Sequence, residues 1–302
     1  MQAGTFTINR PDGHAVYGRL WRPENTPRAV VQIVHGLAEH SARYARLAEA
    51  LTQAGYAVYA HDQRGHGPNT PPADLGFFAE RDGWRKLLDD IQAVAERIAA
   101  DHPGLGRAFL GHSMGSFLGQ TYIAERGDEL AAAVLSGTSG PPPAILPIGK
   151  RIVAFESWRL GPRGKSPLVQ ALLFGEQNKP FRPARTPYDW LSRDAAEVDK
   201  YVAAPLCGFA LTNPLAADLV GALADLASPA LAARIPKTLP IYVFSGARDP
   251  VGAKLQGLLD VYRSAGLDVT AKLYPDARHE TLNETNRDEV TRDLIGWLDA
   301  RV

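Results

Sequence analysis

Short apolar runs alternate with amphipathic segments along most of the chain. The runs are rich in β-branched residues and poor in charge, which is typical of strands buried on both faces of a parallel sheet. Between the first two runs, Tyr44, Leu47 and Leu51 share one helical face, and Ser41 could cap the start of that helix. Residues 84–98 repeat the helical spacing between the second and third runs. The predicted core strands cover residues 29–34, 56–61, 107–112, 131–136, 240–245 and 269–274.

Further elements flank this alternation at both ends of the chain. Residues 4–23 resemble an antiparallel hairpin that turns near Asp12-Gly13, a common addition at the edge of such a sheet. Near the other end, Leu294 and Leu298 lie on one face of a final amphipathic helix. Together the elements predict an α/β fold in which helices cover both faces of a mostly parallel central sheet.

One long segment interrupts the pattern. After the strand that ends near Ser136, roughly a hundred residues pass before another sheet strand begins near Leu239, which is too long for a loop. The segment contains apolar helical patches such as residues 168–174, and many prolines. We therefore predict a mostly helical cap (residues 140–235) inserted into a core formed by residues 1–139 and 236–302.

Composition and charge exclude several classes of protein. Apolar residues make up 45% of the chain and charged residues 22%, which is enough for a large buried core. The 33 basic and 33 acidic residues balance, so no net charge would attract nucleic acid, and we predict no nucleic-acid partner. Cys207 is the single cysteine, and residues 1–10 lack the apolar centre of a signal peptide, so we expect a cytoplasmic protein.

The stretch Gly111-His112-Ser113-Met114-Gly115 stands where a predicted strand meets a predicted helix. Glycines at both ends lack the Cβ atom that would obstruct a very tight turn. Such a turn projects the serine from the carboxyl edge of the sheet, and the helix amino terminus stabilises negative charge on a substrate oxygen. The pattern predicts that Ser113 is a nucleophile and that the Met114 amide is an oxyanion donor.

A serine nucleophile needs a base to take its proton and a carboxylate to orient that base. Asp249 and His279 each follow a predicted strand, so both are expected at the carboxyl edge of the sheet beside Ser113. The order Ser, Asp, His is the one expected of α/β-hydrolases. Asp276 is an alternative acid, although its place in the loop of His279 favours a turn-forming role.

Other residues near the predicted strand ends have candidate roles. Gly36 could let the backbone turn so that the Leu37 N–H becomes a second oxyanion donor, or it could belong to an ordinary turn. His61 and His66 lack the clustered carboxylate or cysteine ligands of a convincing metal site, so we predict neither a metal nor a cofactor. His112 is expected to point away from the serine.

Five blocks of the sequence occur together and in a fixed order. They are HGLAEHSARY (35–44), HDQRGHG (61–67), GHSMG (111–115), SGARDPVG (245–252) and YPDARHETLNE (274–284). Together they resemble the monoglyceride lipase and lysophospholipase-like branch of the α/β-hydrolases, also described as serine aminopeptidase-like. The resemblance implies that Ser113, Asp249 and His279 form a catalytic triad. It also implies that the Leu37 and Met114 amides form the oxyanion hole.

The same resemblance concerns the polar end of the substrate site. In monoglyceride lipases the acidic and basic residues that match Glu39 and Arg43 hold glycerol; here, four apart on a helix, they could simply pair with each other. The chain departs from the family at Ala38, where a glycine is common. It also departs at Leu282, where some members have a second histidine. Both departures bear on selectivity for glycerol.

The expected function is hydrolysis of carboxylic esters through an acyl-enzyme, with a monoacylglycerol or similar single-chain lipid ester as substrate. The cap would form the acyl pocket, with Leu172 and Phe174 facing the acyl chain or, in part, a membrane surface. Alternatively, these apolar side chains could only join the cap to the core.

Two other functions stay open. An aminopeptidase would need an acidic pocket for the substrate ammonium, and the cap offers Glu156, Glu176 and Glu197 without evident clustering. A non-catalytic binding protein on this fold would usually have lost part of the triad. The sequence gives no signal for an oligomeric state.

Overall fold

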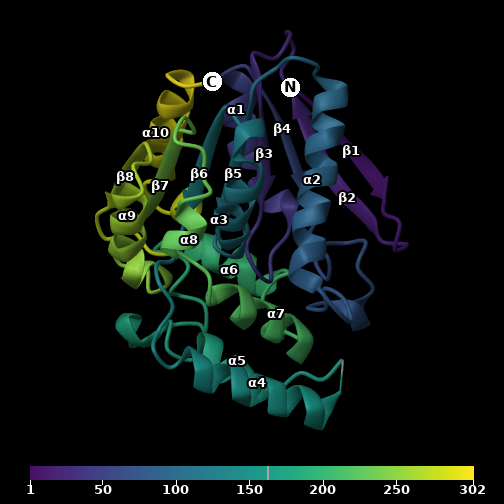
Figure 1. The fold of residues 1–302 in the computed structure, drawn as a ribbon, viewed down its shortest axis with the longest axis vertical. Helices are drawn as coiled ribbons and strands as arrows, with labels where there is room; N and C mark the ends of the chain where they lie inside the picture. Colours follow the sequence, from purple (N-terminus) through teal and green to yellow (C-terminus); the bar gives the residue numbers. More distant parts are fainter. Residues whose placement is uncertain (162) are drawn as a thin grey trace.

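The computed structural model describes residues 1–161 and 163–302. In these residues eight strands form one sheet in the order β1-β2-β4-β3-β5-β6-β7-β8 (Figure 1). β1 pairs antiparallel with β2, and β2 pairs antiparallel with β4, whereas the remaining neighbours are parallel. The strands are β1 (Gln2–Asn9), β2 (Ala15–Arg22), β3 (Ala29–Val34), β4 (Tyr56–His61), β5 (Arg107–His112), β6 (Ala132–Ser136), β7 (Ile241–Gly246) and β8 (Val269–Tyr274).

Burial explains why these segments form strands. Every residue of β3, β4, β5, β6 and β7 is buried, because helices cover both faces of the central sheet. β8 lies at an edge and exposes several of its residues. The core strands differ from the sequence prediction by no more than one residue at either end. The predicted hairpin is present as β1 and β2, which turn through Gly13 at a positive φ of 83°.

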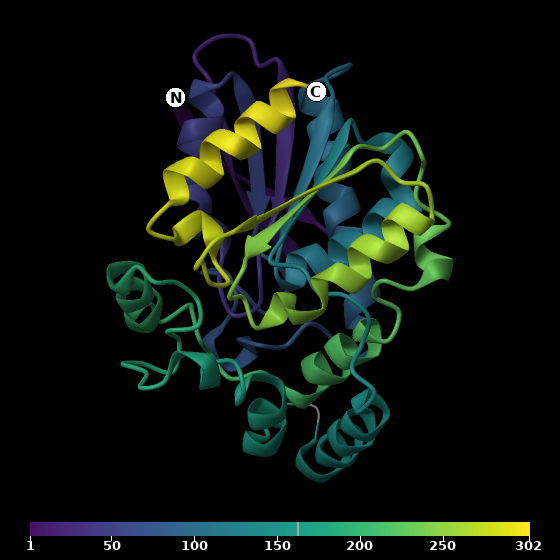
Figure 2. The ribbon, with the colours of Figure 1, turned by 90° about the vertical axis from the view of Figure 1, so that its left-hand side faces the viewer.

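Helices cover both faces of the sheet. α2, α3 and α9 pack with one face in a cluster that includes Phe109, Leu135 and Val243. α1 and α10 pack with the other face around Val31 and Val58, and Figure 2 shows α10 lying across it. The bounds are α1 (Ala45–Gln53), α2 (Gly83–Asp101), α3 (Met114–Arg126), α9 (Leu255–Ser264) and α10 (Arg287–Asp299), with 3₁₀ turns at Ser41–Tyr44, Pro72–Asp74, Gly127–Glu129, Lys179–Phe181, Val251–Lys254 and Thr281–Asn283.

The start of α1 differs from the sequence prediction. Ser41 does not cap the helix, because the chain first makes a 3₁₀ turn and α1 begins at Ala45. The Ser41 backbone N–H instead donates to Asp62 Oδ1 at 2.7 Å. This bond ties the turn after β3 to the loop after β4.

The described part of the segment between β6 and β7 contains five α-helices and no sheet strand, and it lies beyond the carboxyl edge of the sheet (Figure 1). We call residues 140–235 the cap segment. Part of it has a small core of its own, formed by Leu146, Val153, Val169, Ala216 and Val220. Within the described chain, every helix is too short or too polar to cross a bilayer. The helices of the cap segment are α4 (Leu146–Leu160), α5 (Pro167–Phe174), α6 (Ala195–Ala203), α7 (Asn213–Leu223) and α8 (Pro229–Ala232).

Candidate active site

Ser113 lies between the end of β5 and the start of α3 in a strained backbone conformation, with φ 51° and ψ −120°. The turn is possible because Gly111 and Gly115 flank it. A Cβ atom on Gly115 would overlap the carbonyl oxygen of Val34, and one on Gly111 would overlap the carbonyl oxygen of Gly115. Strain of this kind costs roughly 1–3 kcal/mol and persists only where the surrounding structure enforces it.

The structure brings the serine, histidine and aspartate of the predicted triad together. His279 Nε2 lies 2.9 Å from Ser113 Oγ, and His279 Nδ1 lies 2.9 Å from Asp249 Oδ2. Asp249 also accepts hydrogen bonds from Ser245 Oγ at 2.7 Å and from the Val251 N–H at 2.9 Å. With Nδ1 donating to the carboxylate, His279 Nε2 is free to accept the serine proton.

Burial and charge set the protonation of this pair. Burial alone would raise the pKa of the Asp249 carboxyl, but the facing His279 ring and the hydrogen bonds from Ser245 and Val251 hold it below its ordinary value. Burial also opposes a charged His279 ring, yet the Asp249 carboxylate more than offsets this and raises the pKa of His279. The imidazole is therefore a stronger base than an isolated histidine.

Asp276, the alternative acid, lies elsewhere. It is exposed in the turn after β8, at a positive φ of 57°. An aspartate tolerates this conformation better than most residues, which accounts for its place in the turn. The structure thus pairs His279 with Asp249 and leaves Asp276 in solvent.

Leu37 and Met114 both line the cavity beside Ser113. Met114 is the first residue of α3, so its N–H belongs to the unpaired amino end of that helix. Among residues 1–161 and 163–302, neither amide donates to a protein acceptor. Two free N–H groups next to a nucleophile are the arrangement that a developing oxyanion requires.

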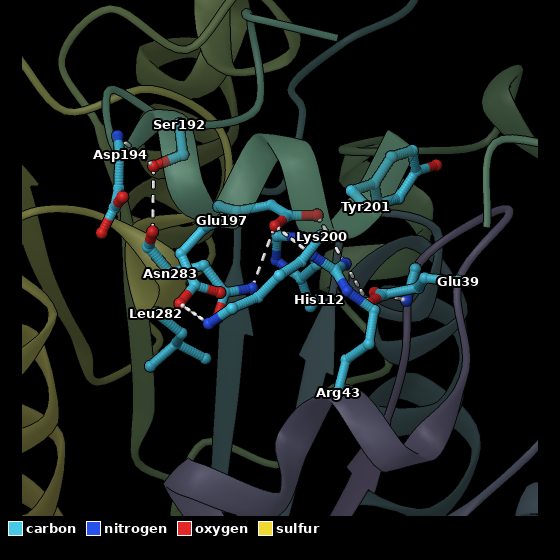
Figure 3. A network of polar contacts seen from close by, with 12 residues as sticks. Glu39, Arg43, His112, Ser192, Asp194, Glu197, Lys200, Tyr201, Leu282 and Asn283 are labelled. Carbon is cyan, nitrogen blue, oxygen red and sulfur yellow. Dashed lines mark hydrogen bonds and ion pairs between the residues drawn. The ribbon is translucent and has the colours of Figure 1, made fainter. Parts of the chain in front are cut away.

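Glu39 and Arg43 form an ion pair at 2.7 Å (Figure 3). Their spacing in the sequence had suggested this pairing as the alternative to a role in holding glycerol. Glu39 Oε1 also accepts from the Gly36 N–H at 2.6 Å and from Tyr44 Oη at 2.9 Å, while Arg43 binds Glu280 through both Nη atoms. Burial opposes the charge on Glu39, but Arg43 and the neighbouring histidines lower its pKa to about 2. Both carboxylate oxygens of Glu39 are therefore already engaged within the protein.

A cavity of about 620 Å³ lies between the core and the cap segment, with Ser113 and His279 in its wall. Of the two residues predicted for the acyl pocket, Phe174 lines this cavity and Leu172 does not. Leu172 is 47% exposed and lies on the α4 side of α5, because successive residues of a helix point in different directions. Other large apolar side chains of the wall include Phe117, Leu173, Leu211, Leu219 and Leu223.

The histidines weighed as metal ligands are buried in the core. His66 Nε2 accepts a hydrogen bond from the Ala38 N–H at 3.0 Å, and burial lowers the pKa of both His61 and His66 to about 3. In the described part of the chain, histidine, cysteine, aspartate and glutamate form no group of three or more that could hold a metal.

The chain was compared with known protein families and proteins. A family model described as "Serine aminopeptidase, S33" matches residues 25–286. The chain belongs to this family. The relatives include the "Monoacylglycerol lipase" of Mycolicibacterium smegmatis, which is 31% identical over 92% of this chain and 91% of its own length. The human "Monoglyceride lipase" is 28% identical over 96% of this chain and 88% of its own length.

Among solved structures, a thermostable carboxyl esterase from Bacillus coagulans in complex with glycerol matches this member of the S33 family with a TM-score of 0.90. It is 28% identical, and the match covers 100% of this chain and 99% of that chain. The α/β-hydrolase fold and the relationship to monoglyceride lipases that the sequence motifs predicted are thereby confirmed.

The site of this S33-family protein contains residues that the motifs did not indicate. Trp190, from the cap segment, places its ring 4.9 Å from the His279 ring, and its carbonyl oxygen accepts from the His279 N–H at 3.3 Å. His112 does not point away from the site as expected: its ring lies 4.9 Å from that of His279, and its Nδ1 lies 3.2 Å from Ser136 Oγ. Ser136 ends the adjacent strand β6 and draws the ring to this side.

The contact between Asp249 and His279 yields a prediction about rate and pH. Asp249→Asn should lower kcat by about 10⁴-fold, the loss typical of removing a triad carboxylate, whereas Asp276→Asn should leave it unchanged. In the native protein kcat/KM should fall as pH drops through the raised pKa of His279, because only the neutral ring accepts the serine proton. In Asp249→Asn the acid limb of the plot of kcat/KM against pH should move to lower pH, because the His279 ring has lost the carboxylate that raises its pKa. Steady-state rates across pH measure both effects, and a greater loss in Asp276→Asn would contradict the assignment.

Proposed function

We propose that this protein hydrolyses carboxylic esters of a single acyl chain, with monoacylglycerols as the principal substrate class. The observation that carries the proposal is the Ser113–His279 contact of 2.9 Å in the wall of a largely apolar cavity of about 620 Å³. The relatives named as monoacylglycerol and monoglyceride lipases support the same substrate class. The intact Ser113, His279 and Asp249 contacts favour an enzyme over a silent binding protein.

In the acylation step Ser113 Oγ attacks the ester carbonyl carbon while His279 Nε2 takes the hydroxyl proton. The Leu37 and Met114 amides stabilise the negative oxygen of the tetrahedral intermediate. The bond to the alcohol then breaks, and His279 returns its proton to the leaving oxygen. Asp249 keeps the imidazole oriented and stabilises its charged form throughout.

In the deacylation step water replaces the alcohol. His279 takes a proton from the water as its oxygen attacks the acyl carbon, and the same two amides hold the second oxyanion. The bond from the acyl carbon to Ser113 Oγ breaks, the serine regains its proton, and the fatty acid leaves. The two reaction steps use only side chains and backbone amides of the protein, and together they consume one water molecule.

The charges around the cavity favour esters over aminoacyl substrates. Glu156 pairs with Arg159 inside the cap segment, and Glu197 binds Arg46 and Lys200, so neither faces the cavity. Glu39 and Glu280 do line the cavity, but both carboxylates are engaged in ion pairs with Arg43, and the three side chains together keep one net negative charge. A substrate ammonium would therefore meet no free carboxylate among the described cavity residues.

We also propose that the cap segment touches lipid surfaces transiently while the protein remains cytoplasmic, in line with its single cysteine. Ile148, Phe155 and Trp158 lie on one face of α4 and are 55%, 55% and 80% exposed. Lys150 and Arg151 add exposed positive charge on the same helix. An amphipathic helix of this kind inserts apolar side chains at the interface while its basic residues meet anionic headgroups.

A panel of esters tests the proposed function. The panel contains monoacylglycerols, lysophospholipids, short aryl esters and aminoacyl amides. Their values of kcat/KM should differ clearly, and monoacylglycerols should have the highest. Ser113→Ala should lose roughly 10⁵-fold in kcat on every substrate and should no longer react with a fluorophosphonate probe. Preferred cleavage of aminoacyl amides would show the protein to be a peptidase instead.

Phe174 and Leu172 provide a matched pair for the acyl pocket. Phe174→Ala should enlarge the cavity and shift the ratio of kcat/KM between long and short acyl chains about tenfold toward long chains. Leu172→Ala, two residues away on the outside of α5, should leave the ratio unchanged. An equal shift in both variants would mean that the effect comes from a loosened cap and not from the pocket.

Trp158 tests the membrane contact. Trp158→Ser should lower partitioning onto vesicles containing anionic lipid by about tenfold. The variant lacks the indole side chain that the native protein would bury in the membrane interface. Turnover of a water-soluble short ester should not change. Leu273→Ser removes an apolar side chain that is 53% exposed on β8 and serves as the control. Equal vesicle binding by the native protein and Trp158→Ser would argue against α4 as the contact.

A further inference from the structure

Ala38 adopts a conformation that is unfavourable for its residue type. Its φ is 53°, in the left-handed region where a Cβ atom causes strain, and it is one of few residues other than glycine found there in the described chain. Ala38 directly follows Leu37, whose amide is one of the two free donors beside Ser113. The position of that donor therefore depends in part on the groups that hold Ala38 in place.

Hydrogen bonds hold Ala38 from two sides. From the core, His66 Nε2 accepts the Ala38 N–H at 3.0 Å. From the cap segment, the Ala38 carbonyl oxygen accepts from Tyr201 Oη at 2.9 Å and from the Gly208 N–H at 3.0 Å. At the start of the same loop, Glu39 Oε1 accepts the Gly36 N–H at 2.6 Å. The Gly36 carbonyl oxygen, in the same peptide as the Leu37 N–H, lies 2.7 Å from His35 Nδ1. With the bond on the Ala38 N–H, the peptides on both sides of Leu37 are thus held.

The core side of this arrangement is insensitive to pH. His66 Nδ1 lies 2.9 Å from the carbonyl oxygen of Arg64, which can only accept, so Nδ1 carries the proton and Nε2 is the acceptor for Ala38. Burial lowers the pKa of His66 to about 3, and the ring stays neutral over the physiological range. The His66 contact is therefore a permanent part of the core.

The cap side is held by packing. Tyr201 is 6% exposed on α6, and the Arg43 guanidinium lies 4.9 Å from the centre of its ring (Figure 3). The Tyr188 ring lies 5.0 Å away. Tyr188 Oη donates to the Gly208 carbonyl oxygen at 2.9 Å and steadies the second donor to Ala38. Both donors from the cap segment are consequently rigid with respect to the oxyanion loop, residues 36–39.

We propose that Tyr201 is a positioning residue of the oxyanion hole: its hydroxyl, together with the Gly208 amide, holds Ala38 in its strained conformation and so aims the Leu37 N–H at the reacting carbonyl. The inference rests on the proposed function and adds to it a role for the cap segment in the chemical step. Without the Tyr201 hydroxyl, Ala38 can relax toward negative φ, and the Leu37 amide moves with it.

This role predicts a specific kinetic signature. Substrate binding draws mainly on the apolar wall of the cavity, which a missing hydroxyl on Tyr201 does not alter. The oxyanion forms only in the transition state, so a misplaced Leu37 donor lowers kcat and leaves KM nearly unchanged. A residue that merely touched the glycerol end of the substrate would change KM.

The test is Tyr201→Phe, measured with a monoacylglycerol substrate and two kinds of inhibitor. We expect kcat to fall about tenfold, part of the loss that removing an oxyanion donor causes, with KM within twofold of the native value. A trifluoromethyl ketone is attacked by Ser113 Oγ to give a hemiketal whose oxygen occupies the oxyanion hole, while His279 takes the serine proton. Its affinity should fall by about the same factor. The affinity of an uncleavable alkylglycerol ether should not change.

Tyr59→Phe is the matched control, because it also removes a tyrosine hydroxyl bonded to the protein, at 2.8 Å from Asp101 at the far end of α2. It should leave kcat and both inhibitor affinities unchanged. Ala38→Gly supplies a rescue, since glycine adopts positive φ without strain. In that background Tyr201→Phe should cost less than threefold in kcat.

The outcomes separate the possibilities. A raised KM, or an equal loss of affinity for ketone and ether, would show that Tyr201 contacts the substrate and would overturn the positioning role. An unchanged kcat, or the same cost in the Ala38→Gly background, would overturn it as well. Failure of the native protein to cleave esters or to bind the ketone would instead refute the proposed function itself.

Discussion

The strained turn at Ser113 is the constraint on which the rest of the site depends. Its φ of 51° can be held only because β5 and α3 anchor both sides in the buried core. In addition, Gly115 lets the backbone of β3 come close, and Gly111 makes room for the Gly115 carbonyl oxygen. The parallel sheet adds the other components for geometric reasons: the ends of adjacent parallel strands meet at one edge, so Asp249 and His279 arrive beside Ser113 although they are distant in sequence.

This dependence explains which parts could be predicted from the sequence. The core strands and the serine turn carry local signals, namely continuous apolar runs and flanking glycines, and the structure follows them closely. Trp190 and Tyr201 carry no such signal, because their contacts with His279 and Ala38 arise only when the cap segment folds onto the core. Likewise the run 168–174 is apolar at every position except Gln170, so periodicity could not show that Phe174 faces the cavity and Leu172 does not.

Buried charges near the site are paired in an arrangement that also favours proton uptake by His279. Glu39, Arg43 and Glu280 are nearly inaccessible to water, and each carboxylate is paired with the one guanidinium between them. An unpaired charge in this position would be strongly destabilising. The cluster retains one net negative charge close to His279, and both glutamates contribute to the raised pKa of that ring, after the larger contribution of Asp249. The same residues therefore stabilise the loop and favour proton uptake by the histidine.

The cap segment consists of two parts that relate differently to the core. Residues 188–209 are bonded to the loops that carry His279 and Ala38: the His279 and Glu280 amides donate to the carbonyl oxygens of Trp190 and Leu191 at 3.3 and 2.7 Å, and Ala38 accepts from Tyr201 and Gly208. α4 and α5 instead pack in the cap's own small core and expose apolar side chains. An opening that displaced residues 188–209 would break the bonds that orient the base and the oxyanion loop. Movement confined to α4 and α5 would break none of them, and would uncover the apolar cavity with the catalytic groups still in place.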